Sequence, residues 1–188
     1  MRLLCAFLLV AICAPGAELA SKRREYRRGL VSKRALAGAG ASSAVSTARN
    51  SPHEWGRGAG GVVKRFGSSL GQHAVKHSIE FGVSAWRHEN LRYRRSDKHG
   101  TWPRVGYAVK HTFIVPRTNR SGKTLAVSRV SGNMGAGMIS RLWQPASAAS
   151  LGSGLATGGI GLGADVGLNV AREFWPEKKK HKIKSGHR

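Results

Sequence analysis

Cysteine is nearly absent from this sequence: its two cysteines, Cys5 and Cys13, both lie close to the start of the 188-residue chain. Around them, a dozen apolar residues follow Arg2 and end in a Pro-Gly break. This pattern is typical of a secretory signal peptide, whose apolar core is too short to span a bilayer as a mature helix. We expect cleavage after Gly16, which would exclude disulfides, cysteine-ligated zinc and a cysteine nucleophile from the mature chain. Lipidation at Cys13 and an uncleaved membrane anchor are the alternatives.

Acidic residues are also scarce, with nine Asp and Glu against 32 Lys and Arg. The sequence places no two carboxylates together for general acid–base catalysis, and it has no Gly-x-Ser-x-Gly motif for a serine nucleophile. The stretch GRGAGG lacks the Lys-Ser/Thr ending of a phosphate loop. We therefore expect a protein that is not an enzyme and that carries no cofactor.

Positive charge is concentrated at the two ends of the chain. Residues 21–34 carry seven Lys and Arg against one acid, and residues 178–188 carry six with no acid. The stretch ALAGAGASSAVSTARNS, which follows the first basic run, has too little apolar bulk to offset the entropy of ordering it. It is expected to be flexible, with a transient helix as the alternative. We divide the chain into a signal peptide (1–16), a basic, flexible linker (17–50), a helical domain (51–177) and a basic tail (178–188).

Apolar residues recur with helical spacing through most of the expected domain. A helix or broken pair of helices from Glu54 to about Tyr93 has two apolar stripes, so we expect neighbours, or lipid, on two of its sides. Further helices are predicted in residues 101–116, 124–143 and 147–175, each closed by a proline, and the end of the first could instead be a short strand. The fold class expected is all-α, a bundle of about four glycine- and alanine-rich helices with basic disordered arms at both ends.

Charge is almost absent from one long interval in the second half of the chain. Between Arg141 and Arg172 the one ionisable residue is Asp165, and this interval is long enough to cross a bilayer. The Leu, Ile and Val of residues 151–168 favour insertion by about −3 kcal/mol, whereas an Asp near the centre costs roughly +2.5 to +3.5 kcal/mol. Because the two terms nearly cancel, the sequence favours a soluble or peripheral bundle over an independent membrane span.

Glycine is abundant, with 25 residues, and many glycines recur every four positions. In a helix each costs about 1 kcal/mol relative to alanine, but glycines four apart form a ridge against which another backbone can pack closely. We predict such a glycine zipper, used for helix packing or self-association, at Gly67, Gly71, Gly154, Gly158, Gly159, Gly163 and Gly167. The last three are expected to contact another helix, with the ridge of the first two as the candidate.

Three side chains have the spacing of a metal site. His73, His77 and Glu80 lie at i, i+4 and i+7 on one edge of the first long helix, so they could converge on a divalent metal. The general-base glutamate of a zinc protease motif is absent, since the stretch reads HAVKHSIE. The alternative is a solvated edge on which Glu80 neutralises Lys76 or His77.

Asp165 is the one acid of an otherwise uncharged segment. A carboxylate is costly to bury without a partner, so Asp165 should face water or meet a cation such as Arg129, Arg141 or a histidine. The functional alternative is a proton or ion site inside a membrane bundle.

A chain with so large a positive charge is expected to bind polyanions. The candidate residues for binding an anionic surface are Arg92, Arg94, Arg95, Lys178, Lys179 and Lys180. An exported protein meets anionic lipid or envelope polymers more readily than nucleic acid, so nucleic acid is not expected as a partner. A homo-oligomer is compatible with the glycine ridges.

Three stretches resemble a group of exported bacterial proteins usually described as hypothetical: SPHEWGRGAGGVVKRFGSSLGQHAVKHSIEFGVSAWRHENLRYRR, GTWPRVGYAVKHTF and GLGADVGLNVAREFWPE. The likeness covers residues 51–177 and implies a bacterial envelope location and a discrete helical domain, without site residues. We expect a non-enzymatic protein of the periplasm or envelope membrane that packs or self-associates through its glycine ridges and binds anionic membrane surfaces through its basic arms. A soluble periplasmic polyanion-binding protein and a metal-dependent activity at the His/Glu edge are the alternatives.

Overall fold

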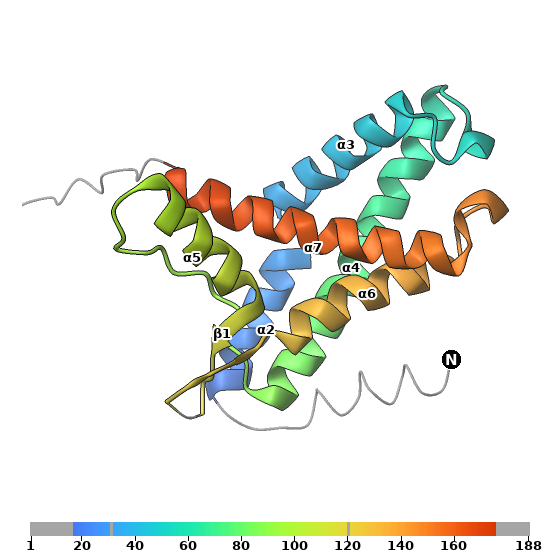
Figure 1. The fold of residues 1–188 in the computed structure, drawn as a ribbon. Coiled ribbons are helices and arrows are strands. Elements are labelled where there is room, and N and C mark those ends of the chain that lie inside the picture. The colour runs from blue at the N-terminus through green and yellow to red at the C-terminus, as the bar shows by residue number, and fades with distance from the viewer. Residues whose placement is uncertain (1–16, 31, 120, 176–188) are drawn as a thin grey trace, which may run out of the picture.

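The computed structural model describes residues 17–30, 32–119 and 121–175, and α-helices make up most of these residues (Figure 1). This confirms the all-α prediction. The helices are α2 (Ala17–Leu30), α3 (Lys33–Ala48), α4 (Ala59–Arg87), α5 (Thr101–Phe113), α6 (Val127–Ser140) and α7 (Leu151–Phe174), with short 3-10 helices η1 (His53–Trp55) and η2 (Ala146–Ala148). The strands β1 (Ile114–Pro116) and β2 (Lys123–Leu125) pair antiparallel, with Val115 opposite Thr124. The expected signal peptide lies outside the described residues.

Helix α4 is the longest helix described, with 29 residues, and it contacts α2, α3 and α6 (Figure 1). The two apolar stripes of this helix indicate such contacts with more than one neighbouring helix. The helix ends where His88 adopts the left-handed conformation, with φ at 53°, and donates its N–H to the carbonyl of Ser84. A segment without regular helix then leads to α5, so α4 ends several residues before Tyr93, the bound expected from the sequence.

The expectation of a flexible linker in residues 17–50 is wrong where the chain is described, because α2 and α3 form there and both contact α4. Ala35 and Ala39 of α3 are buried. From α2, the Tyr26 ring lies 5.1 Å from the Phe81 ring, measured between centroids. Helix α3 needs few large apolar side chains to become ordered, because its small side chains let it lie close against α4. Such contacts stabilise a helix that is marginal in isolation.

The interior of the bundle is filled by small and polar side chains instead of large apolar ones. Among the described residues, the buried hydrophobic side chains are Ala35, Ala39, Ala108, Val115, Ala126 and Ala136. Charged side chains are buried beside them, namely Arg65, Glu80, Glu89, Arg129 and Glu173. Since a buried charge must be paired or hydrogen-bonded, hydrogen bonds between distant segments hold much of this fold together.

Helices α6 and α7 cross with their backbones in direct contact. A Cβ atom on Gly137 would lie 2.3 Å from the carbonyl oxygen of Gly154, and one on Gly158 would lie 2.9 Å from the Cα of Met134. Neither distance leaves room for a side chain. Gly154 and Gly158 thus lie at the crossing of α6 and α7, opposite Gly137, a glycine that was not among the predicted ridges.

The other predicted ridge makes no such contact. A Cβ on Gly159, Gly163 or Gly167 would meet no other atom within 4 Å, and the same holds for Gly67. Gly71 contacts the indole of Trp143 and not a helix backbone. The expected packing of the α7 ridge against the α4 ridge is therefore wrong within this chain.

Polar residues of α7 explain which of its stripes is buried. Asp165, Asn169 and Glu173 are spaced four apart and continue the stripe of Gly154 and Gly158 along the helix. Leaving these groups without partners would be costly, so they turn inward, where Asp165 and Glu173 accept hydrogen bonds and Asn169 donates one to Thr112. Gly159, Gly163 and Gly167 lie on another side of the helix and are consequently turned outward.

Candidate functional site on the outer face of the bundle

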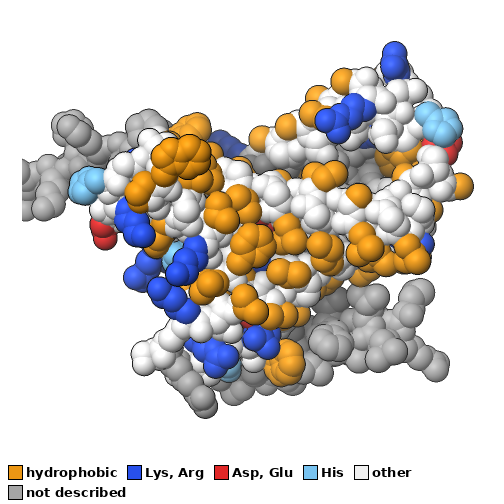
Figure 2. Space-filling model, viewed as in Figure 1, with side chains coloured by type: hydrophobic (Ala, Val, Ile, Leu, Met, Phe, Trp, Pro, Cys, Tyr) orange, Lys and Arg blue, Asp and Glu red, His pale blue; other side chains and the backbone are white. Residues whose placement is uncertain are grey.

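The outward side of α7 is apolar along its length. Leu151, Leu155, Ile160 and Leu168 are each between 55% and 71% exposed. We call this surface, together with the outward Gly159, Gly163 and Gly167, the α7 face. Figure 2 shows hydrophobic side chains spread over α7 and its neighbours on this side of the molecule. Several large apolar side chains exposed on one helix are more than the fold itself requires, so this face is a candidate contact surface.

Aromatic side chains lie beside cations at the carboxyl end of α7. Trp175 is 67% exposed, and Arg95 donates to its carbonyl oxygen at 2.5 Å. The guanidinium carbon of Arg104 lies 4.6 Å from the centroid of the Phe174 ring. Trp102, at the start of α5, is 84% exposed. Exposed Trp side chains on a basic part of the surface suit the boundary between a lipid bilayer and water.

The predicted anionic-surface residues divide into three groups. Arg92 and Arg94 are exposed in the segment between α4 and α5. Arg95 is half-buried and holds the end of α7, as described above. Lys178, Lys179 and Lys180 lie outside the described residues. In Figure 2, Lys and Arg side chains gather at one end of the hydrophobic face, so cationic and apolar surfaces adjoin.

Asp165 meets a cation as predicted, but the cation is Lys76 of α4 and not Arg129, Arg141 or a histidine. The Lys76 ammonium donates to both carboxylate oxygens at 2.7 Å, and the amide nitrogen of Asn133 donates to Oδ2 at 2.8 Å. The carboxylate is thus enclosed by donors from α4 and α6. This arrangement is what a structural ion pair requires.

Glu80 lies one turn beyond Lys76, with 3.9 Å between its Oε1 and the lysine Nζ. It fits beside Gly132 of α6, where a Cβ atom would lie 2.5 Å from the Glu80 Cγ. Burial raises the pKa of Glu80 to about 7, against the opposing effect of Lys76. Burial, together with His73 and Lys76, lowers the pKa of His77 to about 4. Both side chains are therefore kept largely uncharged in mildly acidic solution.

The predicted metal site at His73, His77 and Glu80 is not formed. The His73 Nε2 lies 3.1 Å from the carbonyl oxygen of Gly29, and the two histidine rings meet edge to face with 4.3 Å between centroids. Within the described part of the chain, no three His, Cys, Asp or Glu side chains are grouped so as to hold a metal ion. The histidines point toward helix α2. The spacing of these residues along α4 could not reveal that another helix lies there.

Two buried glutamates were missed by the sequence analysis. Glu89 accepts hydrogen bonds from the backbone N–H and the hydroxyl of Ser128, at 3.1 and 2.5 Å, and from Arg87 at 2.7 Å. The backbone of Glu89 also pairs with that of Arg117 in an isolated antiparallel β-bridge. Glu89 therefore joins the end of α4 to the start of α6. The one signal in the sequence that pointed to Glu89 was the small number of acidic residues in the chain.

Glu173 plays the same part at the end of α7. It accepts hydrogen bonds from the Tyr93 hydroxyl and from the backbone N–H and hydroxyl of Ser96, the latter two at 2.9 and 3.1 Å. Burial opposes its ionisation, but these bonds hold the pKa of Glu173 below its usual value. A carboxylate surrounded in this way is stabilised as an anion and is unsuited to donate a proton.

Comparison with known proteins adds no relative. No family model matches this chain, and no curated protein or solved structure matches it either. Among the described helices, none combines the length and the apolar character needed to cross a bilayer. The buried carboxylates Asp165, Glu89 and Glu173 have partners within the fold, so the outer apolar and basic surface is the feature that the fold itself leaves unexplained.

Proposed function

We propose that this protein is an exported, non-enzymatic helical protein of the bacterial envelope that attaches to anionic membrane surfaces. The observation that supports the proposal is the inverted distribution of side chains. Alanine, glycine and hydrogen-bonded polar groups fill the interior, while the leucines and isoleucine of the α7 face and several tryptophans lie outside. Apolar surface that the fold does not bury is expected to bind an apolar environment elsewhere.

Electrostatics supports the same partner. The formal net charge is +23, and Arg92 and Arg94 lie exposed on the described surface. Each Lys or Arg near an anionic membrane surface contributes about 1 kcal/mol of attraction within a Debye length. Apolar side chains entering the interface would add to this attraction, as they do for helices that lie in the membrane surface. An anionic envelope polymer shares the charge and is the second partner to be tested.

The test is sedimentation of the full chain with large vesicles. Vesicles of phosphatidylglycerol and phosphatidylcholine should retain the protein at low salt, and vesicles of phosphatidylcholine alone should retain much less. The double variant Leu155→Gln/Ile160→Gln should weaken retention by at least about tenfold, because burying each such side chain contributes roughly 1.5–3 kcal/mol. The matched control is Leu36→Gln/Val45→Gln, which changes two exposed apolar side chains of α3.

Equal retention of both double variants would overturn the role of the α7 face. Equal retention by neutral and anionic vesicles would overturn the role of charge. If soluble anionic polymer binds the protein but anionic vesicles do not, the partner is the polymer. An export assay with residues 1–16 deleted tests the proposed location, because the deleted chain should stay inside the cell.

A further inference from the structure

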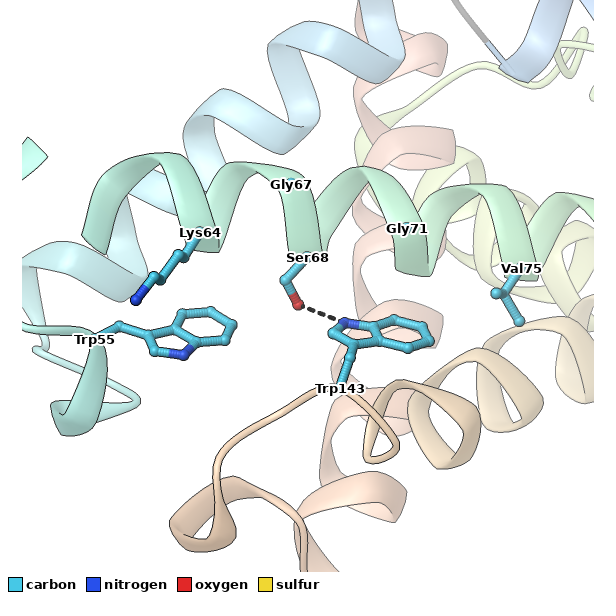
Figure 3. A pocket seen from close by; sticks show the side chains of 7 residues that line it. All are labelled: Trp55, Lys64, Gly67, Ser68, Gly71, Val75 and Trp143. Atoms are coloured by element: carbon cyan, nitrogen blue, oxygen red, sulfur yellow. Dashed lines mark hydrogen bonds between the residues drawn. The ribbon is translucent and has the colours of Figure 1, made fainter. Parts of the chain in front are cut away.

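A groove runs beside α4 on the part of the molecule where η1 and the end of α6 approach that helix. Its volume is about 560 Å³, within the roughly 300–1,000 Å³ typical of small-molecule sites. Figure 3 shows its two indoles, Trp55 and Trp143, lying along the helix with Gly67 and Ser68 between them. We call it the indole groove. It was not among the sites that the sequence analysis singled out.

Polar contacts hold the Trp143 indole and the short helix that carries Trp55. The Trp143 Nε1 donates to the Ser68 hydroxyl at 3.0 Å, and its ring lies 3.5 Å from the position of a Cβ on Gly71. On the other side, the hydroxyl of Ser147 donates to Glu54 at 2.7 Å, which ties η1, the short helix that carries Trp55, to η2. Trp143 thus forms a fixed wall of the groove, and Trp55 lines it from a segment that is itself anchored.

Gly67 leaves the space between the indoles open. It lines the groove, and a Cβ atom placed on it would meet no other atom within 4 Å. A glycine in the interior of α4 lowers helix stability relative to alanine, so the open space is not a requirement of the helix. Any larger residue at this position would project into the groove.

Charge is present at one end of the groove. Lys64 is exposed there, with its side chain beside the Trp55 ring in Figure 3. In the part of the chain that is described, no carboxylate forms an ion pair with it. The opposite end is lined by Val75. Lys64 and Val75 are eleven residues apart on one helix, which places them about 16 Å apart along its axis.

We propose that the indole groove binds an amphiphile with one acyl chain and a carboxylate head, such as a fatty acid. The carboxylate pairs with the Lys64 ammonium, and the chain lies on the indoles and Gly67 toward Val75. The lining supports this class because it offers one cation at one end and apolar surface over the remaining length. The net charge of +23 favours an anionic ligand over a cationic one. The inference stands apart from membrane attachment, which uses the α7 face.

The experiment titrates the full chain with dodecanoate below its micelle concentration, by calorimetry. Binding of one dodecanoate per chain is expected, with dodecanol weaker and dodecyltrimethylammonium weaker still. Gly67→Leu should reduce dodecanoate affinity by about tenfold or more, since it fills the groove. The matched control is Gly82→Leu, the same change on the same helix at a glycine whose Cβ position is also open. Its affinity should equal that of the parent chain.

A second variant tests the head group. Lys64→Met should weaken dodecanoate about tenfold and leave dodecanol unchanged, because it removes the charge and keeps the apolar stem. Unchanged affinity in Gly67→Leu, or equal binding of the cationic and anionic amphiphiles, would overturn the proposal. Vesicle retention of Gly67→Leu should match that of the parent chain. Loss of dodecanoate binding with vesicle binding intact therefore separates this site from the proposed function.

Discussion

Lys76 of α4 donates to both carboxylate oxygens of Asp165 on α7, at 2.7 Å each, although 89 positions separate the two residues in the chain. Asn133 of α6 donates to the same carboxylate. Three helices thus meet at one side chain. Because this pair turns the only acid of the uncharged segment inward, it also leaves the α7 face without charge.

Breaking the pair should destabilise the fold more than removing both partners does. Asp165→Leu and Lys76→Met should each lower the free energy of unfolding by about 2–4 kcal/mol, since each leaves a largely buried charge unpaired. The double variant should lose clearly less than the sum of the two, because it leaves no unpaired charge. Urea unfolding of the four chains measures this coupling. Additive losses would show that the pair does not stabilise the contact between α4 and α7.

The two glycine stripes of α7 should respond oppositely to the same change. Gly158→Ala should destabilise the fold by more than 1 kcal/mol, because its Cβ would lie 2.8 Å from the Met134 sulfur and 2.9 Å from the Met134 Cα. Gly163→Ala should stabilise it by up to about 1 kcal/mol, because its Cβ meets open space and alanine favours helix. Thermal unfolding of both variants measures the difference, and shifts of the same sign would contradict this packing.

Self-association through the α7 face stays a prediction, and Gly163→Leu tests it. The added side chain has room within one chain, so the fold should remain intact. If two copies pack through Gly159, Gly163 and Gly167, the leucine should separate them and shift the sedimentation coefficient toward that of a monomer. A parent chain that already sediments as a monomer would rule out this use of the ridge.

Glu80 and His77 should give opposing pH dependences of stability. The pKa of Glu80 is raised from 4.5 to about 7 by burial, so the native chain keeps a proton that the unfolded chain loses between these values. Stability from Glu80 therefore falls as pH rises from about 4.5 to about 7. The pKa of His77 is lowered to about 4, so the unfolded chain binds the extra proton below pH 6.5. Stability from His77 therefore rises between pH 4 and about 6.5.

The contributions of Glu80 and His77 to the slope of unfolding free energy against pH offset each other in the parent chain. Single variants should reveal each contribution separately. Glu80→Gln should leave a rise in the free energy of unfolding from pH 4 to 6.5, and His77→Gln should leave a fall from pH 4.5 to 7. Each slope should reach at most about 1.4 kcal/mol per pH unit. In the parent chain and in His77→Gln, Lys76 and Arg129 lower the pKa of Glu80, and Asp165 raises it. Urea unfolding across this pH range would contradict the assignment if both variants kept the parent slope.

Arg65 should be irreplaceable by lysine. Its guanidinium is buried and donates to three carbonyl oxygens, those of Ser51, Pro52 and Gly56, at 3.1, 2.7 and 2.6 Å. Lysine cannot reproduce this planar set of donors. Arg65→Lys should lower the free energy of unfolding by about 1–3 kcal/mol per carbonyl left unsatisfied. Arg57→Lys, at an exposed position nearby, is the control that should change little.

The helical fold and the approximate places of four helices were accessible from the sequence. Apolar periodicity and prolines locate α4 to α7 within the predicted ranges, because these signals act between neighbouring residues of the chain. The helices before residue 50 were not accessible from composition. Alanine and serine carry no strong apolar pattern, and α3 forms where they pack against α4, a contact that local sequence does not encode.

The sequence by itself determined that this chain is helical, strongly basic and poor in acids, and that Asp165 would need a partner. Only the tertiary structure decided that the partner is Lys76 and that Gly154 and Gly158, not Gly159, Gly163 and Gly167, face α6. Two glycine stripes of one helix look alike in sequence. Which of them is buried depends on where donors for buried polar groups lie in space, and those donors come from helices distant in the chain.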